Sequence, residues 1–157
     1  MSLRLRRAKR SEAAALVKLI VALAKFEKLN PPDAAARKRL MRDGFGPSAK
    51  FEPWLAFWQG EREPIGYMIL VKLYSSFEAR PTLYLEDLFV LPEYRGRGIG
   101  KAMMRRGIEL AWQRECGRME WTCLDWNVKA QEFYNKLGAR KLSEWYLYRL
   151  HRKQMKP

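Results

Sequence analysis

The sequence predicts a single α/β domain built around a mixed sheet. Segments with strand-like alternation and segments with helical spacing follow one another in the order β-α-α-β-β-β-α-β-α-β. The chain of 157 residues contains no repeat, low-complexity linker or internal boundary. A chain of this length buries a core without disulfides or metal ions, and a hydrophobic content of 48% argues against disorder. We therefore expect residues 1–157 to form one domain.

Hydrophobic periodicity and turn residues define the expected elements. Ser11 and Asp33 are the expected N-caps of the first two helices, and Gly138 follows the last helix as its C′ residue. The strands are expected at residues 3–6, 54–58, 65–74, 83–90, 119–124 and 141–150, and the helices at 12–29, 34–43, 98–115 and 128–137.

Two acidic residues stand next to each other in the strand expected at residues 83–90. On a regular strand, Glu86 and Asp87 point to opposite faces of the sheet, because successive side chains alternate. A β-bulge would change where Asp87 points.

The charge of the chain is high and uneven. The net charge is +14, with 31 basic and 17 acidic residues, which suggests an anionic partner such as a phosphorylated molecule, nucleic acid or a membrane surface. Residues 51–90 form the only acidic block, with six acids and three bases. One His and two Cys argue against a four-ligand zinc site, and two scattered thiols favour a reduced, cytoplasmic protein.

The first 24 residues resemble a signal peptide in outline, because a basic stretch precedes an apolar one. Glu12 and Lys18 interrupt the apolar stretch, and its leucines fall at helical spacing. We expect an amphipathic helix packed on the core, with export as the alternative. No stretch approaches the ~20 uncharged apolar residues of a membrane-spanning helix.

A glycine-rich loop follows the strand expected at residues 83–90. It reads R-G-R-G-I-G over residues 95–100 and opens a helix. Glycines at alternate positions let the backbone approach a ligand closely, and the N–H groups at a helix start bind phosphate. The spacing fits neither the Walker loop nor the dinucleotide fingerprint. The loop predicts an anion site, with a flexible glycine turn as the alternative.

This loop resembles the pyrophosphate loop R/Q-x-x-G-x-G/A of the GNAT superfamily of N-acetyltransferases. The resemblance covers nearly the whole chain and is closest to the spermidine/spermine (diamine) N-acetyltransferases and the thialysine acetyltransferases. The shared motifs are Leu-Ala-Lys-Phe/Tyr-Glu at 23–27, Asp-Gly-Phe-Gly at 43–46, Tyr-Leu-Glu-Asp at 84–87, Trp-Asn at 126–127 and Phe-Tyr-x-x-x-Gly-Ala at 133–139. It implies a central, mostly antiparallel sheet flanked by helices, and acetyl transfer from acetyl-CoA to a primary amine.

The resemblance implies how acetyl-CoA would be held. N–H groups of residues 97–101 would bind the pyrophosphate, Arg95 would add charge, and the backbone of residues 88–90 would pair with the pantetheine. An N–H group near Val90 could polarise the thioester carbonyl. The implied coenzyme-binding residues are Leu88, Phe89, Val90, Arg95, Gly96, Arg97, Gly98, Ile99, Gly100, Lys101, Asn127 and Tyr134.

The resemblance also implies two catalytic residues and an acceptor site. Glu86 matches the carboxylate that takes a proton from the amine through water, and a partly buried Glu with a raised pKa suits that task. Tyr134 matches the acid that protonates the departing thiolate. Glu27, Asp87 and Trp145 match or adjoin substrate-binding positions. The alternatives are core packing for Tyr134, cross-strand packing for Trp145, and solvated or Arg-paired carboxylates.

The leading hypothesis is a cytoplasmic, homodimeric N-acetyltransferase that uses acetyl-CoA and no metal. Its acceptor would be a small diamine, polyamine or Lys-like amine. The dimer would form by pairing or exchange of the strand expected at residues 141–150. A protein Lys or N-terminal acetyltransferase is the second hypothesis, and a basic nucleic-acid-binding module is the third.

Overall fold

The computed structural model describes residues 2–156 and divides into two compact units at the Trp121–Thr122 peptide bond. The first unit contains a sheet and three helices, and the second contains one helix and the C-terminal segment. The strands are β1 (Leu3–Arg7), β2 (Glu52–Trp58), β3 (Gly66–Ser75), β4 (Arg80–Val90) and β5 (Arg118–Glu120), and the helices are α1 (Ala13–Phe26), α2 (Ala34–Asp43), α3 (Ile99–Gln113) and α4 (Val128–Lys136).

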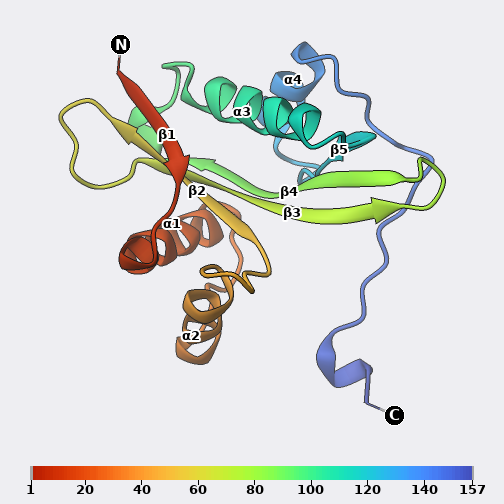
Figure 1. Cartoon of the computed structure of the whole chain (residues 1–157), viewed down its shortest axis with the longest axis horizontal. Helices are drawn as coiled ribbons and strands as arrows, with labels where there is room; N and C mark the ends of the chain where they lie inside the picture. Colours follow the sequence, from red (N-terminus) through yellow and green to blue (C-terminus); the bar gives the residue numbers. More distant parts are fainter. Residues whose placement is uncertain (1, 157) are drawn as a thin grey trace. The chain divides into compact units, whose positions relative to one another are not determined.

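The sheet of the first unit has the strand order β1-β2-β3-β4-β5. The pairs β1–β2, β2–β3 and β3–β4 are antiparallel, whereas β5 is parallel to β4. This confirms the expected mixed, mostly antiparallel sheet. Helices α1 and α2 lie on one side of the sheet and α3 on the other (Figure 1). No helix among residues 2–156 is long and apolar enough to cross a membrane.

The core on the α1 side of the sheet joins the helix to three strands. Leu16 and Leu19 of α1 are 1% and 5% exposed, and they belong to one buried cluster with Tyr67, Ile69 and Phe89. This burial accounts for the apolar spacing in residues 13–26 and confirms an amphipathic helix there.

The start of α1 differs from the expectation. Ser11 is not the N-cap of α1, because residues Arg10–Glu12 form a short 3-10 helix and α1 begins at Ala13. The Glu12 carboxylate accepts a hydrogen bond from the Lys9 N–H at 2.8 Å, at the start of the 3-10 helix, and no side-chain hydrogen bond caps α1 at Glu12. Asp33, in contrast, caps α2 as expected and accepts a hydrogen bond from the Ala36 N–H at 2.7 Å.

The basic N-terminus is largely explained by packing and pairing. The guanidinium groups of Arg4 and Arg6 lie 4.9 and 4.6 Å from the centre of the Phe57 ring. Arg6 also pairs with both oxygens of Glu12, with one N–O distance of 2.8 Å. Arg7 lies 3.8 Å from Glu52. These contacts give the N-terminal charge a structural role.

The Arg6–Glu12 pair makes the stability of the protein depend on pH. The bidentate Arg6 contact lowers the pKa of Glu12 to about 2, against the opposing effect of burial. The folded pKa lies below the unfolded value, so this stabilisation is present above about pH 4.5 and is lost as the pH falls towards 2. We expect Glu12→Gln to lower the free energy of unfolding at pH 7 by about 2 kcal/mol.

Acid unfolding followed by circular dichroism tests this expectation. The difference in stability between the wild type and Glu12→Gln should shrink between pH 5 and pH 2. Glu63→Gln, which changes an exposed Glu in the β2–β3 turn, serves as the matched control. Parallel stability curves for the wild type and Glu12→Gln would contradict the role given to this pair.

Two expected strands differ from the structure. Only Arg118–Glu120 form β5, so residues 121–124 are not part of a strand. Residues 141–150 form no strand at all, and Trp145 and Tyr148 are 72% and 88% exposed. A strand requires a neighbouring strand for its backbone hydrogen bonds, and alternation in the sequence does not supply one.

Candidate active site

The glycine-rich loop has the backbone that its sequence predicts. Gly96 and Gly98 have φ angles of +76° and +77°, in the left-handed region that favours glycine. Apart from the chain neighbours of each glycine and the adjoining helix backbone, no heavy atom of the described residues lies within 4 Å of the position that a Cβ would take at Gly96, Gly98 or Gly100. The outer side of the loop is therefore open to a ligand.

Helix α3 begins directly after this loop. Gly98 is its N-cap residue, and no side chain of the described residues caps the helix there. The N–H groups of the first turn, in Ile99, Gly100 and Lys101, are therefore available, and the helix dipole favours an anion beside them. This arrangement suits a phosphate or pyrophosphate group.

The two arginines of the loop differ in their surroundings. Arg95 donates a hydrogen bond from Nε to the Val90 carbonyl at 2.9 Å, and its guanidinium lies 4.5 Å from the centre of the Phe26 ring. Burial lowers the pKa of Arg95 from its ordinary value. Arg97 lies over the rings of Trp58 and Tyr94 and is exposed. Both side chains are exposed; Arg95 supports the end of β4, and Arg97 also donates a hydrogen bond to the Glu93 carbonyl at 3.2 Å.

One edge of β4 is open along its C-terminal half. Strand β5 pairs with β4 only at Thr82, Leu83 and Tyr84. Beyond Tyr84, no strand of the described residues pairs with the edge of β4 that faces away from β3. The backbone of residues 88–90 lies on this stretch, where an extended ligand could pair as an additional strand.

A β-bulge in β4 brings the two neighbouring acids to one side of the sheet. Asp87 pairs with Ile69 and Leu85 with Leu70, so Glu86 is the extra residue at the register shift. Glu86 and Asp87 both line a cavity of about 320 Å³. The opposite-face arrangement of a regular strand therefore does not occur. The other lining residues are Ile20, Leu40, Lys50, Phe51, Ile69 and Val71.

Of the two carboxyl groups, Asp87 is the less exposed one and is half-buried. Burial, together with the smaller effect of the nearby acids Glu86 and Glu27, raises the pKa of Asp87 to about 6. The Tyr67 hydroxyl donates a hydrogen bond to Asp87 Oδ2 at 3.1 Å, which acts in the opposite direction. Glu86 is exposed, so the expectation of a partly buried Glu86 is wrong. Sequence reasoning missed Tyr67, because only the strand register brings it to Asp87.

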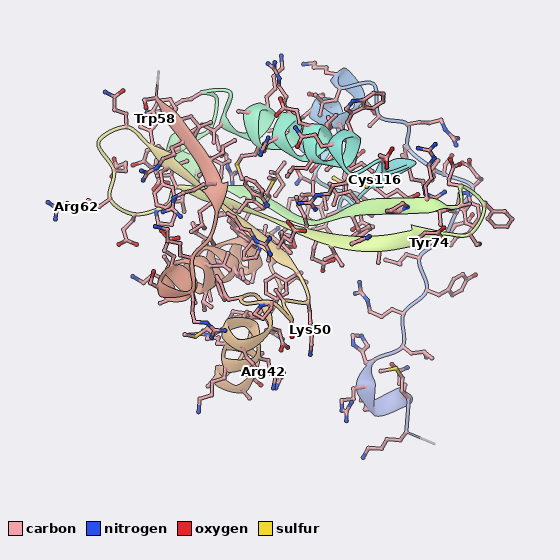
Figure 2. All side chains as sticks on the ribbon, viewed as in Figure 1. Arg42, Lys50, Trp58, Arg62, Tyr74 and Cys116 are labelled. Atoms are coloured by element: carbon pink, nitrogen blue, oxygen red, sulfur yellow. The ribbon has the colours of Figure 1, made fainter. Side chains whose placement is uncertain are left out.

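Two further charged groups belong to the surroundings of the carboxyl pair. Glu27 is partly buried, and that burial raises its pKa. Lys50 lines the cavity and extends from the segment between α2 and β2, near Arg42 (Figure 2). Its Nζ lies 3.4 Å from Asp43, which also pairs with Arg42 at 2.7 Å. The cavity thus has two acids on its sheet wall and a cation at its rim.

The second unit holds the remaining predicted site residues. Asn127 is the N-cap of α4 and accepts a hydrogen bond from the Ala130 N–H at 3.3 Å. Tyr134 lies on α4, partly buried, with its ring centre 5.3 Å from that of Phe133. Trp145 lies in the exposed segment after α4.

The chain belongs to the acetyltransferase (GNAT) family, whose model matches residues 18–139. It is therefore an acyltransferase, and members of this family use acetyl-CoA as co-substrate. This family is the one that the glycine-rich loop and the five shared motifs indicate.

Curated relatives acetylate amines. A thialysine N-epsilon-acetyltransferase from Sus scrofa is 34% identical over 99% of this chain and 96% of its own length. A spermidine/spermine N(1)-acetyltransferase-like protein from Homo sapiens is 29% identical over 96% of this chain and 23% of its own length. An L-ornithine N5-acetyltransferase from Arabidopsis thaliana is 39% identical over 54% of this chain and 37% of its own length.

Solved structures confirm the fold. A probable acetyltransferase is 22% identical and has a TM-score of 0.81, covering 94% of this chain and 97% of its own. An integron cassette protein from the mobile metagenome of V. cholerae is 24% identical with a TM-score of 0.80, covering 96% of this chain and 93% of its own.

Proposed function

We propose that this protein is an acetyl-CoA-dependent N-acetyltransferase that acts on the primary amine of a small diamine, polyamine or Lys-like molecule. The observation that carries the proposal is the bulge at Glu86, because it directs two carboxyl groups into one cavity. A cationic amine suits this wall of the cavity. The names of the relatives, which specify thialysine, ornithine and spermidine/spermine, support the same class of acceptor.

The first unit provides the elements that acetyl-CoA requires. The N–H groups at the start of α3 would hold its pyrophosphate, and the open edge of residues 88–90 would pair with its pantetheine. Acetyl-CoA supplies an activated acetyl group as a thioester. An N–H group near Val90 would stabilise the charge that develops on the carbonyl oxygen.

The two carboxyl groups of the cavity would have different tasks. Asp87 is half-buried, so its carboxylate would bind the ammonium group with less competing water than an exposed carboxylate would. Glu86 is exposed at the bulge and would take the proton from the ammonium through a water molecule. Glu27 would contact a second, distant amine. Trp145 would offer a ring face to a cation.

Among the proposed acceptors, Lys50 favours a Lys-like one. A molecule with an amine at one end and a carboxylate at the other could place the amine at Asp87 and the carboxylate near Lys50. A polyamine would instead meet Lys50 with a like charge. The exposed setting of Lys50 limits the expected preference to about three- to fivefold.

The other parts of the proposal concern the second unit and the whole chain. Tyr134 would protonate the thiolate that leaves, and Asn127 would contact the coenzyme. We propose that residues 1–157 act as one N-acetyltransferase domain. We also propose a homodimer, supported by the exposed apolar residues of 145–150, and a cytoplasmic location, supported by the low number of two cysteines in the chain.

An acceptor panel tests this function. Purified protein and acetyl-CoA are incubated with single amines, and released thiol is measured. L-lysine and cadaverine form the decisive pair, because they differ only by a carboxylate. We expect turnover of both, with kcat/KM three- to fivefold higher for lysine, and loss of that preference in Lys50→Gln. Thiol release that no amine stimulates, but a Lys peptide does, would replace this proposal with a protein acetyltransferase.

A further inference from the structure

Tyr67 brings a buried hydroxyl group to the acceptor cavity. Its side chain lies on β3, is 0% exposed, and is part of the core on the α1 side. The hydroxyl nevertheless donates a hydrogen bond to Asp87 Oδ2 at 3.1 Å. Burial of a phenol costs free energy unless its hydroxyl finds a partner, and here that partner is a group at the cavity wall.

The hydrogen bond depends on the register of β3 and β4. Tyr67 pairs with Phe89 and Ile69 with Asp87, so Tyr67 and Asp87 are diagonal neighbours on one face of the sheet. The Tyr67 ring also packs against Phe89, with ring centres 6.3 Å apart. The ring is thus fixed by the core, and its hydroxyl group is directed at Asp87 by the register.

The charged groups near Asp87 oppose its ionisation, apart from Lys50 at the rim of the cavity. Glu86 stands beside it on β4, and Glu27 follows α1, and both repel a charge on Asp87. Ile20 of α1 and Leu40 of α2 line the cavity with apolar surface. A hydrogen bond donated to a carboxylate stabilises its charged form. Burial raises the pKa of Tyr67, so the phenol stays protonated and remains a donor.

We propose that Tyr67 is a positioning residue that fixes the Asp87 carboxylate in the charged form that binds the acceptor ammonium. This inference rests on the proposed function and deepens it. Tyr67 touches neither acceptor nor coenzyme and acts through Asp87 alone. It leaves the second carboxylate oxygen, Oδ1, for the acceptor. The Asp87 carboxylate would accordingly select an amine that is cationic at neutral pH.

Tyr67→Phe tests the proposal because it keeps the ring and removes the hydroxyl group. Without the hydrogen bond, Asp87 should titrate about one pH unit higher. The acidic limb of kcat/KM for L-lysine should move up by the same amount, so KM should rise about twofold at pH 7 and nearly tenfold at pH 5. Above pH 8, kcat should stay close to wild type. Tyr74→Phe removes an exposed hydroxyl at the far end of the same strand (Figure 2) and should leave both profiles unchanged.

Direct titration separates this proposal from the proposed function. The Asp87 carboxyl carbon is followed by NMR against pH in wild type and Tyr67→Phe, without any substrate. An upward shift supports the positioning role even if no amine is acetylated, in which case the proposed function alone fails. Either of two results would overturn the positioning role. One is that Asp87 titrates identically in wild type and Tyr67→Phe. The other is that Tyr67→Phe changes KM equally in the wild-type and Asp87→Asn backgrounds.

Discussion

Replacing Glu86 by Gln is expected to lower kcat for the amine acceptor about 100-fold while KM changes by less than about twofold. Gln keeps the size of the side chain at the bulge but cannot take a proton. The exposed position of Glu86 lets water carry the proton from the ammonium to it. Steady-state kinetics with L-lysine at pH 7.5, together with acetyl-CoA binding by calorimetry, measure both constants and the integrity of the coenzyme site.

Asp87→Asn provides the matched contrast at the adjacent residue. It removes the charge of the half-buried carboxyl group, so KM should rise about 30-fold while kcat falls much less. The wild-type profile should lose activity as the pH falls through about 6, because protonation of Asp87 removes the charge that binds the ammonium. That limb should be absent in Asp87→Asn. If Asp87→Asn lowers kcat and Glu86→Gln raises KM, the two roles are reversed.

The conformation of the glycine-rich loop could be predicted from the sequence because it is decided locally. Glycine is the residue that adopts positive φ at little cost, and Gly96 and Gly98 do so. The helix after the loop follows from apolar spacing in residues 99–113. Asp33 could be identified as a cap for the same reason, because a cap and its helix are separated by only a few residues.

The bulge at Glu86 could not be predicted from the strand alone. Leu83, Leu85, Asp87 and Phe89 alternate regularly in the sequence, as in an uninterrupted strand. The register shift is a property of the β3–β4 pair, between Ile69 and Leu70. The acceptor site therefore depends on a relation between two strands, although each strand was expected at nearly its observed place.

Tyr67 is a second residue whose place in the site could not be predicted from the sequence. In the sequence it is one of a run of apolar residues on β3, and core packing explains it fully. Its distance of 3.1 Å from Asp87 depends on a partner 20 positions later in the chain. The segment at 141–150 shows the opposite case. Its sequence has a strand-like pattern, but no strand among residues 2–156 pairs with it.

Tyr134→Phe is expected to lower kcat about 10- to 100-fold and to leave acetyl-CoA affinity within about twofold. The Tyr134 hydroxyl group is the donor that would give its proton to the departing thiolate. Without this proton donor, the coenzyme thiolate must leave with its full negative charge. Phe keeps the ring that packs against Phe133, so α4 should remain folded.

Single-turnover kinetics separate this chemical effect from binding and product release. The rate of acetyl transfer in one turnover should fall with kcat, and calorimetry should report the unchanged affinity for acetyl-CoA. Tyr146→Phe removes the hydroxyl group of a side chain in the same unit that is 79% exposed. This variant should behave as wild type. In the proposed mechanism, Tyr134 acts on the leaving group and Glu86 on the amine. Combining Tyr134→Phe with Glu86→Gln should then multiply the two losses if both protons move in one transition state. Unchanged turnover in Tyr134→Phe would remove the residue from the mechanism and leave the thiolate to depart unassisted.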